Sequence, residues 1–569
     1  AAALQASGLE TRLRPSPASE PFRLRITRRK ISNGEVVLLF NETPETITRS
    51  AALSGDWHSI HMLDPATGED SLLTPADSEI AIAVPPGRIR LLLLQRAPND
   101  NSSGEPVSVP ENHWDWAQWK NPPRQMHPMM RWWWPGNAVE RDELRDELRS
   151  LYEAGYGGVE IQTLTIGLSQ AHLEENESSI YTVGTDSFFE HLKTVIRLAG
   201  ELEMAVDLTL GSGWSSGGPF INAHPEQQLL RAQFDVDGPA RLSRPLPRAA
   251  QPWYAMPSNW IIRNTIGEFD TNTHLRAVVA ARLEAHDDTP VITDFTNSSD
   301  AVNGGTLDWR VPEGKHRIFA FYQNATAHNA VASAYPGALK ASRVLDHLHP
   351  GGAQEYLEEL GDPWLDALSP LAPRAVFVDS FELIGELPWS TQFAQRFAEL
   401  RGYDVTPYLP LLFMARGESK YVNVVLPPVP AYISVNEMGA RIREDYEAVR
   451  QQLFLESFVR PVAEWADSRG VQFRLQAHGG YGDYLDSYQM ADIPEAEGLF
   501  AAGSYDFLKL AASAGHVAGR RFISSESFIT MTTDYNALTI EDYYRLAGNA
   551  YEAVINMTYC HGYEYHYET

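Results

Sequence analysis

The chain has 569 residues, too many for one hydrophobic core, and a prior of ~150 residues per domain predicts about three or four domains. Lys and Arg total 46 against 74 Asp and Glu, which gives a formal net charge of −28. This charge argues against a nucleic-acid partner, because such binding depends on Lys and Arg that neutralise phosphates. It argues equally against binding to an anionic membrane surface.

The cysteine and asparagine patterns bear on the cellular compartment. A single cysteine, Cys560, excludes an intrachain disulfide framework. N-x-[ST] sequons favour a secretory route, so we expect a secreted, periplasmic or extracellular protein; they begin at Asn41, Asn101, Asn176, Asn297, Asn324 and Asn556. The first residues, AAALQAS, lack a basic segment, which indicates that any signal peptide is already missing. No apolar run reaches about 20 residues, so we expect no membrane-spanning helix. The sequence predicts no oligomeric state.

Residues 1–98 are predicted to form a small all-β module. Short alternating segments separated by turn residues are typical of antiparallel strands, and FRLRITRR, EVVLLFN and SEIAIAV are examples. Residues 99–125, which contain APNDNSSGEPVSVPENH, are rich in Pro, Ser, Asn and Gly and are predicted to be a linker.

From Met126 onward, strand patterns alternate with helical patterns such as VERDELRDELRSLYEAG. This alternation is typical of βα units and a parallel sheet. Residues 126–569 are therefore predicted to form an α/β fold, a (β/α)8 TIM barrel, because eight candidate strands complete that barrel. The candidates are MMRWWW, GGVEIQ, AVDLTLG, AVFVDSF, QFRLQAHG, AEGLFA, RFISSESF and AVINMTYCHG.

The third and fourth candidate strands are separated by far more than one helix. Residues 232–334 contain FDVDGPARL, HLRAVVAARLEA, GGTLDWRVPEG and HRIFAFYQN, which read as further strands. We expect an inserted β-sandwich carried on one barrel loop, with a role in shaping a substrate cleft or a purely structural role.

Two glutamates stand at predicted strand ends, where barrel enzymes gather their catalytic groups. The fourth strand ends VFVDSFE, which places Asp379 and Glu382 at the mouth. The seventh ends ISSESF and places Glu526 there, close to Arg520 and Arg521. A helix N-cap or salt bridge for Glu382, and a structural Arg–Glu pair for Glu526, are the alternatives.

Two carboxyl groups facing one cleft suit glycoside hydrolysis, in which one protonates the leaving oxygen and the other activates water or attacks the sugar. Their separation decides the stereochemical outcome, and the sequence does not supply it. No G-x-x-x-x-G-K-[ST] loop or G-x-S-x-G elbow is present. A single Cys excludes Cys-based zinc clusters.

Further polar and aromatic residues follow predicted strands and are candidates for substrate binding: Trp132, Trp133, Trp134, Trp214, Gln476, His478 and His561. Trp214 lies in GSGWSSGGP, whose glycines allow a close backbone approach to a ligand. Taken alone, each residue also fits a purely structural role, such as a core tryptophan or a hydrogen-bonded structural histidine. Because all of them are expected at one rim of the barrel, substrate binding is the favoured role.

The segment ADIPEAEG carries Asp492, Glu495 and Glu497 near the sixth strand. Several carboxylates within a few residues are suited to a hard cation such as calcium. Solvated loop charges are the alternative.

An ordered set of motifs resembles glycoside hydrolase family 106, chiefly α-L-rhamnosidases. The set is RWWWPG, GYGGVEIQ, FVDSFE, RGYDVTPYLP, LQAHG, ADIPEAEG, SAGHVAGRRFISSESF and INMTYCHGY. The resemblance implies a (β/α)8 barrel and an inverting mechanism, with Glu382 as general acid and Glu526 as general base. It also implies calcium at the sugar hydroxyls, with Glu495 or Glu497 as ligand candidates.

The chain departs from this family at both ends. It stops at Thr569, directly after the eighth predicted strand, where the family continues through a last helix and further β-modules. Its N-terminal segment, from LQASGLETRLRP to MLDPATGE, resembles what normally follows the barrel. We therefore expect a permuted chain or one cut from a tandem protein, with the closing helix unaccounted for.

The leading hypothesis is an exo-acting α-L-rhamnosidase-like hydrolase with a carbohydrate substrate. A retaining barrel glycosidase of another sugar specificity is the second reading. The third is a non-catalytic carbohydrate-binding relative, against which the intact pair of strand-end glutamates counts.

Overall fold

The computed structural model describes residues 13–16, 23–74, 79–97, 114–250, 267, 269–286, 289–413, 418–419, 437–499, 503–529 and 538–566. The chain divides into two compact units. The first contains Ala1–Met129, Ala496–Ser513 and Phe522–His561; the second contains Met130–Glu495, Ala514–Arg521 and Gly562–Thr569. No helix of the described residues has the length and apolar character needed to cross a membrane.

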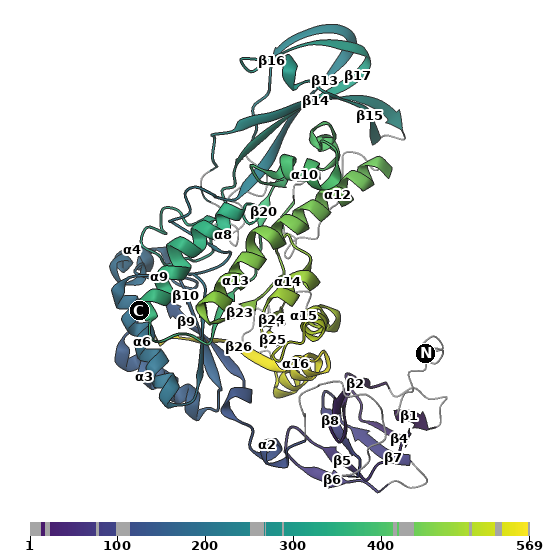
Figure 1. Ribbon diagram of the computed structural model, residues 1–569, viewed down its shortest axis with the longest axis vertical. Helices are drawn as coiled ribbons and strands as arrows, with labels where there is room; N and C mark the ends of the chain where they lie inside the picture. Colours follow the sequence, from purple (N-terminus) through teal and green to yellow (C-terminus); the bar gives the residue numbers. More distant parts are fainter. Residues whose placement is uncertain are drawn as a thin grey trace. The chain divides into compact units, whose positions relative to one another are not determined.

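The N-terminal part of the first unit is a pair of antiparallel sheets, drawn in purple in Figure 1. One sheet has the order β2 (Arg25–Ile31), β3 (Gly34–Phe40), β8 (Ile89–Gln95), β5 (Ser59–Leu63) and β6 (Asp70–Leu72). The other has the order β1 (Leu13–Ser16), β4 (Ile47–Leu53) and β7 (Glu79–Val84). Their alternating inner residues form one apolar core that includes Val37, Leu39, Ile60, Ile82, Leu92 and Leu94. A short helix, α2 (Trp116–Lys120), and a 3-10 turn, Arg124–Met126, follow.

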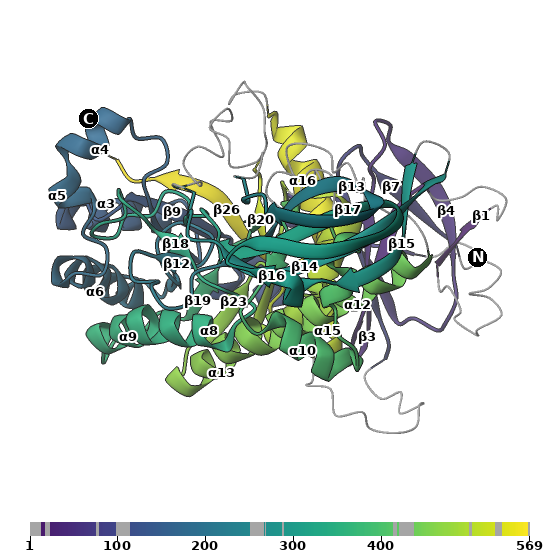
Figure 2. The same ribbon diagram turned by 90° about the horizontal axis from the view of Figure 1, so that it is seen from above.

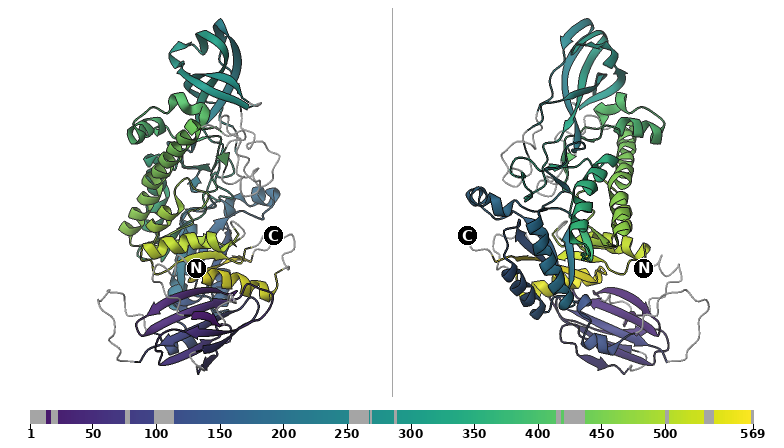
Figure 3. Two further views of the ribbon diagram at one scale, coloured as in Figure 1. Left: turned by 90° about the vertical axis from the view of Figure 1, so that its right-hand side faces the viewer. Right: turned by 60° about the vertical axis from the view of Figure 1, so that its left-hand side comes forward.

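Helix α16 (Ile540–Glu552) packs against these N-terminal strands within the first unit (Figure 3). The guanidinium of Arg88 lies 3.4 Å from the ring centroid of Tyr544, and Thr27 Oγ1 donates a 2.9 Å hydrogen bond to the carbonyl of Glu552. Gly548 leaves room for the ring of Phe40, which a Cβ at that position would strike. The N-terminal β-module therefore packs closely against α16, the helix that precedes the last barrel strand.

The barrel is closed and has eight strands, as the sequence predicted. In chain order these are β9 (Met129–Pro135), β10 (Gly158–Leu164), β11 (Ala205–Thr209), β19 (Ala375–Val378), β23 (Gln472–Leu475), β24 (Ile493–Glu497), β25 (Ser524–Ser527) and β26 (Met557–Glu564). The sixth strand, Ile493–Glu497, begins earlier than predicted and shares Ala496 and Glu497 with the predicted segment AEGLFA, whose last two residues lie outside the described residues. The acidic segment expected in a loop is therefore buried strand, with Glu495 fully buried.

Helices connect the strands in the order expected for βα units. After β9 comes α3 (Arg141–Glu153), and after β10 come α4 (Gln170–Glu175), α5 (Glu177–Ile180) and α6 (Asp186–Glu201). Before β19 lie α8 (Pro350–Tyr356), the π-helical turn Leu357–Gly361 and α9 (Asp362–Leu368). After β19 come α10 (Phe393–Arg401), the 3-10 helix Thr406–Leu411, α12 (Glu437–Phe454), the π-helical turn Leu455–Val459 and α13 (Arg460–Arg469). Helices α14 (Tyr484–Met490) and α15 (Tyr505–Val517) follow β23 and β24.

The insertion after β11 is β-rich, but its described strands belong to one six-stranded antiparallel sheet rather than to two facing sheets. Its members are β13 (Gln227–Pro245), β14 (His274–His286), β15 (Thr289–Asn297), β16 (Val302–Asn303), β17 (Thr306–Ala325) and β21 (Pro388–Trp389). Figure 2 shows the long strands β13 and β17 running together. A bulge between Gly238 and Ala240 interrupts their register, and bulges bend the strands that carry them.

The insertion is tied to the loop that follows β19. Strand β13 pairs with β21, only a few residues beyond Glu382 in the chain. The amide N–H of Glu386 also donates to Gln228 Oε1 at 3.0 Å, and the Leu229 N–H donates to the Leu387 carbonyl at 2.9 Å. The small pairs β12 (Gly217–Gly218) with β18 (Arg343–Val344), and β20 (Ile384–Gly385) with β22 (Glu418–Ser419), complete the described strands.

Candidate active site

The four apolar residues of β19 are buried, and Asp379, Ser380 and Glu382 follow them immediately. The backbone of Glu382 is left-handed, with φ of 45°, a conformation that is costly for a residue with a Cβ and is often kept at functional sites. Two hydrogen bonds hold the segment to the end of β23: Phe381 N–H to the His478 carbonyl at 3.1 Å, and Leu383 N–H to the Gly479 carbonyl at 3.4 Å. The strand-end position predicted for Glu382 is thus occupied by a half-buried carboxyl on a fixed backbone.

The Glu382 carboxyl group has a donor at each oxygen. The indole Nε1 of Trp214 lies 2.8 Å from Oε2, and the Ser380 hydroxyl lies 3.4 Å from Oε1. Trp214 comes from the glycine-rich segment after β11, so two barrel loops converge on this carboxyl group. A positioned carboxyl of this kind is suited to donating or accepting a proton.

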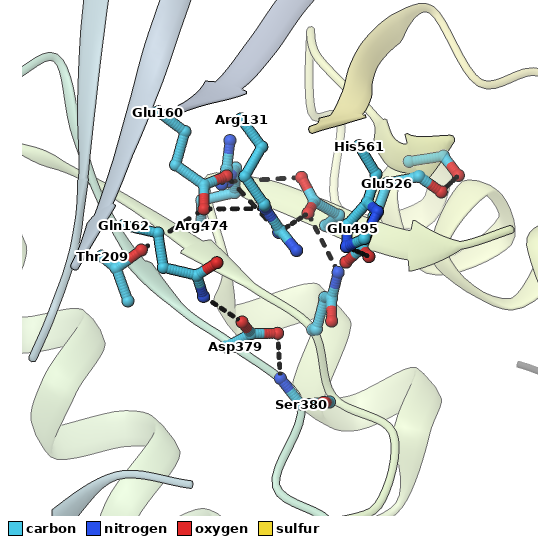
Figure 4. Close-up of polar contacts among 12 residues, drawn as sticks. Arg131, Glu160, Gln162, Thr209, Asp379, Ser380, Arg474, Glu495, Glu526 and His561 are labelled. Carbon is cyan, nitrogen blue, oxygen red and sulfur yellow. Dashed lines mark hydrogen bonds and ion pairs between the residues drawn. The ribbon is translucent and has the colours of Figure 1, made fainter. Parts of the chain in front are cut away.

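Asp379, directly after β19, accepts hydrogen bonds from the Gln162 side chain of β10 and from the Ser380 backbone (Figure 4). Gln162 Nε2 donates to Asp379 Oδ2 at 2.6 Å, and the Ser380 N–H donates to Oδ1 at 2.8 Å. Trp133 Nε1 donates to Gln162 Oε1 at 3.0 Å, which fixes the orientation of the amide. Gln162 was missed by sequence reasoning, although a Gln inside the wholly buried strand GVEIQTL was a usable signal.

A network of buried charges fills the barrel interior of the second unit (Figure 4). Arg474 contacts three carboxylates: Glu160, Asp207 at 3.1 Å and Glu495 at 3.2 Å. Arg131 lies 3.0 Å from Glu160 and 3.7 Å from Glu495. All of these side chains are at most 3% exposed, so their desolvation must be offset by mutual pairing.

This network was not predicted, but the sequence carries its signature. Strands β9, β10, β11, β23 and β24 each contain one of these charged residues among apolar neighbours. Charged side chains seldom occupy buried strands unless they have partners. Strand β19 supplies Phe377 instead, whose ring centroid lies 4.0 Å from the Arg474 guanidinium and 5.1 Å from that of Arg131.

Glu495 does not fit the calcium-ligand role expected for it. Two guanidinium groups neutralise its carboxylate, and Gln476 Nε2 donates to its Oε1 at 3.1 Å. A divalent cation beside these arginines would meet strong repulsion. In the described part of the chain, no three Asp, Glu, His or Cys side chains lie together as a metal-ligand set. Asp492 likewise pairs with Arg520, at 3.1 Å. The calcium expectation therefore depends on Glu497, which is buried at the end of β24.

The three consecutive tryptophans of β9 do not share one environment, because successive strand side chains point to opposite faces. Trp132 and Trp134 are fully buried. Trp132 Nε1 donates to Glu147 of α3 at 2.7 Å, and the Trp134 ring lies against Phe188 of α6. This placement contradicts the substrate-binding role expected for both, since they pack the barrel against its helices. Trp133 lies on the opposite face, with Arg131, and remains a candidate.

Gln476 and His478 are fully buried. Gln476 holds Glu495, and the backbone of His478 anchors the Glu382 segment. In this structure both residues support the site and expose no surface to a substrate.

In the first unit, Glu526 of β25 lies beside His561 of β26 (Figure 4). Glu526 Oε1 is 3.3 Å from His561 Nε2, and the two side chains are 5% and 21% exposed. The Glu526 carbonyl accepts from Gly498 N–H at 2.7 Å. His561, expected to bind substrate, is therefore a partner of Glu526.

Three comparisons bear on this arrangement. The sequence matches the profile of glycoside hydrolase family 106, described as α-L-rhamnosidase, over residues 120–253 and 268–563. A protein of Formosa agariphila named "Putative beta-glucuronidase" is 22% identical over 442 residues, which cover 72% of this chain and 34% of that protein. The solved rhamnosidase of Novosphingobium sp. PP1Y has the same fold, with a TM-score of 0.54 and 18% identity over 79% of this chain and 56% of that one.

The chain thus spans well under two thirds of either relative. The family profile, in contrast, matches most of the chain, including Glu382 and Glu526. The chain belongs to glycoside hydrolase family 106, the α-L-rhamnosidase family.

Proposed function

We propose that the protein hydrolyses a terminal glycosidic bond, with α-L-rhamnose as the favoured sugar, through a pair of carboxyl groups. The observation that carries the proposal is Glu382: a carboxyl group directly after a barrel strand, on a left-handed backbone, with a hydrogen-bond donor at each oxygen. Barrel enzymes place their catalytic groups at this end of the strands. Membership of family 106 supports the sugar and the reaction.

In this mechanism Glu382 protonates the glycosidic oxygen as the bond to the sugar breaks. Glu526 removes a proton from the water that attacks the anomeric carbon, which gives inversion. Asp379 keeps N–H donors at both of its oxygens, an arrangement that favours the ionised carboxylate. Its negative charge would stabilise the oxocarbenium character of the sugar in the transition state.

A retaining mechanism is the alternative for the same two glutamates. Carboxyl groups ~5–5.5 Å apart would favour a covalent intermediate, and ~6.5–9.5 Å would favour inversion. NMR of the first-formed anomer distinguishes them, because an inverting enzyme releases β-L-rhamnose from an α-L-rhamnoside.

A panel of aryl glycosides tests the proposed reaction, with the α-L-rhamnoside first. The β-D-glucuronide is included because of the name of the Formosa relative. Glu526→Gln should abolish turnover, and Glu382→Gln should abolish it for glycosides whose leaving group needs a proton. The folded protein should keep its thermal midpoint in both variants, and Glu399→Gln, on an exposed face of α10, should retain activity. Turnover that survives both active-site changes would sink the assignment. Calorimetric sugar binding without hydrolysis would favour a binding protein.

The proposed calcium dependence no longer includes Glu495 as a ligand. The Glu495 carboxylate forms ion pairs with two arginines, so no step of the reaction is assigned to a cation at this residue. Assays with and without a chelator test whether the protein needs calcium at another place, with Glu497→Gln as the variant that removes the remaining candidate.

A secreted, periplasmic or extracellular location is also proposed. Two of the sequons give it no support, because Asn41 and Asn324 are 0% and 2% exposed and a folded chain could not carry glycans there. Asn297 and Asn556 are exposed, and Asn101 lies outside the described residues. Fractionation of the producing cells tests the location.

A further inference from the structure

We infer that Trp214 is a positioning residue for the general acid and determines which oxygen of Glu382 carries the transferable proton. The inference rests on the proposed function, because it concerns the proton that Glu382 would donate. Trp214 Nε1 lies 2.8 Å from Glu382 Oε2. An indole N–H can only donate, so Oε2 is the accepting oxygen of this bond.

The backbone of Trp214 is fixed before its side chain reaches Glu382. Gly213 N–H donates to the Thr163 carbonyl at the end of β10, at 3.2 Å, and the Trp214 carbonyl accepts from Val331 N–H. Ser212 Oγ donates to the same Thr163 carbonyl at 2.8 Å. Gly213 lies so close to the Val331 carbonyl that a Cβ there would overlap it. The indole therefore projects from a rigid segment.

Glu382 is fixed from the opposite side. Its backbone is left-handed, with φ of 45°, and a Cβ on Gly479 would lie 2.5 Å from the Glu382 nitrogen. The close approach of these two backbones leaves the carboxyl group with little freedom except rotation of its own side chain. The hydrogen bond from Trp214 restricts this rotation of the Glu382 side chain.

The consequence for the reaction follows from the chemistry of a carboxylic acid. The indole can only donate, so its 2.8 Å bond makes Oε2 the carbonyl oxygen of the neutral acid. The proton then resides on Oε1, because the Ser380 hydroxyl, at 3.4 Å from Oε1, can accept a hydrogen bond as well as donate one. During catalysis the O–H bond at Oε1 breaks, the proton forms a bond to the leaving glycosidic oxygen, and the electron pair stays on the carboxylate. The indole hydrogen bond strengthens as this negative charge develops, since bonds to charged acceptors are about twice as strong as neutral ones.

This role differs from that of a tryptophan that only stacks on the sugar. A stacking residue contributes to the binding of every substrate with the same sugar, so its loss raises KM whatever the leaving group. A residue that acts through the acid matters most when the leaving group needs protonation. A 2,4-dinitrophenolate leaves with little help, whereas an alkoxide does not leave without a proton.

The test compares 2,4-dinitrophenyl and methyl α-L-rhamnosides with wild type, Trp214→Phe and Glu382→Gln. Loss of the indole N–H should lower kcat/KM for the methyl glycoside about 10- to 100-fold, and for the dinitrophenyl glycoside by roughly threefold or less. Trp465→Phe is the matched control, because Trp465 Nε1 donates to Asp362 at 2.9 Å between α13 and α9. It should leave both rates unchanged.

If Trp214→Phe fails to fold, benzothienylalanine at position 214 keeps the shape of the indole and replaces only its N–H. Equal losses on both substrates, or no loss, would overturn the positioning role. The proposed function fails separately, either when wild type cleaves neither substrate or when Glu382→Gln shows no dependence on the leaving group.

Discussion

The amide of Gln162 donates a 2.6 Å hydrogen bond to Asp379 Oδ2, and its own oxygen is held by Trp133. Replacing Gln162 with Leu keeps the volume but removes the donor. Because hydrogen bonds to charged groups contribute about 1.5–3 kcal/mol, kcat/KM for the preferred glycoside should fall ~10- to 100-fold. Steady-state kinetics and a thermal melt measure the effect, and the melting midpoint should change little.

Gln354→Leu is the control for this change, since Gln354 makes a similar amide-to-carboxylate bond, at 2.8 Å to Glu358, on an exposed helix. Gln162→Glu should be more harmful than Gln162→Leu, because it places a second carboxylate against Asp379. Wild-type kinetics in Gln162→Leu would show that Asp379 needs no such support.

Arg474 is fully buried and pairs with Glu160, Asp207 and Glu495. Arg474→Met should destabilise the protein by about 3–5 kcal/mol, because it leaves buried carboxylates without their counter-charge. Urea unfolding monitored by circular dichroism measures the loss. Adding Glu495→Gln to Arg474→Met should recover part of it.

Arg469→Met provides the comparison on the surface, where Arg469 pairs with Asp362 and Asp366 and is 29% exposed. Pairs of this kind contribute about 0–1 kcal/mol, so this variant should unfold close to wild type. Equal effects of the two substitutions would mean that the interior network does not depend on Arg474.

The barrel was predictable because its strands are apolar runs separated by helical patterns, and both signals are local. The sixth strand was placed too late because its two glutamates resemble loop residues. Glu495 can be buried in the strand because Arg474 of the neighbouring β23 and Arg131 of β9 neutralise it, and local sequence does not reveal such pairing.

The candidate site likewise combines features that local sequence predicts with features that depend on tertiary contacts. Glu382 was found from its position after a strand, which is local. The bond from Trp214 to Glu382 depends on the conformations of two loops, which no periodicity encodes. The alternation of β9 was readable in advance: Trp132 and Trp134 must share one face, and Arg131 and Trp133 the other. The substrate-binding role predicted for all three tryptophans was wrong for Trp132 and Trp134, which are fully buried.

His561 lies 3.3 Å from Glu526, and this contact predicts a kinetic signature opposite to that of Trp214. His561→Phe should lower kcat/KM by about tenfold, to the same extent for good and poor leaving groups, because Glu526 acts on water and not on the leaving oxygen. His61→Phe is the matched control, since His61 Nδ1 lies 3.8 Å from Asp70 within the N-terminal β-module. A loss confined to poor leaving groups would contradict the assignment of Glu526 as base.

Two buried neighbours, Asp346 and His347, should shape the pH dependence of stability. Burial, with a smaller effect of Glu226, raises the pKa of Asp346 to about 8. Folded protein therefore holds this proton up to about pH 8, whereas the unfolded chain releases it near pH 3.8, so Asp346 makes stability fall as pH rises between these values. Burial lowers the pKa of His347 to about 3 from 6.5. This shift makes stability fall as pH decreases below 6.5.

The two effects oppose each other below pH 6.5, and only Asp346 acts between pH 6.5 and 8. Asp346→Asn, which resembles the protonated acid, should therefore remove a decline of about 2 kcal/mol across that window, at 1.36 kcal/mol per pH unit. Urea unfolding at pH 6.5, 7.25 and 8 measures it. Asp366→Asn, at a side chain that is 68% exposed, should keep the wild-type decline. A parallel decline in Asp346→Asn would mean that Asp346 is already ionised in the folded protein at pH 6.5.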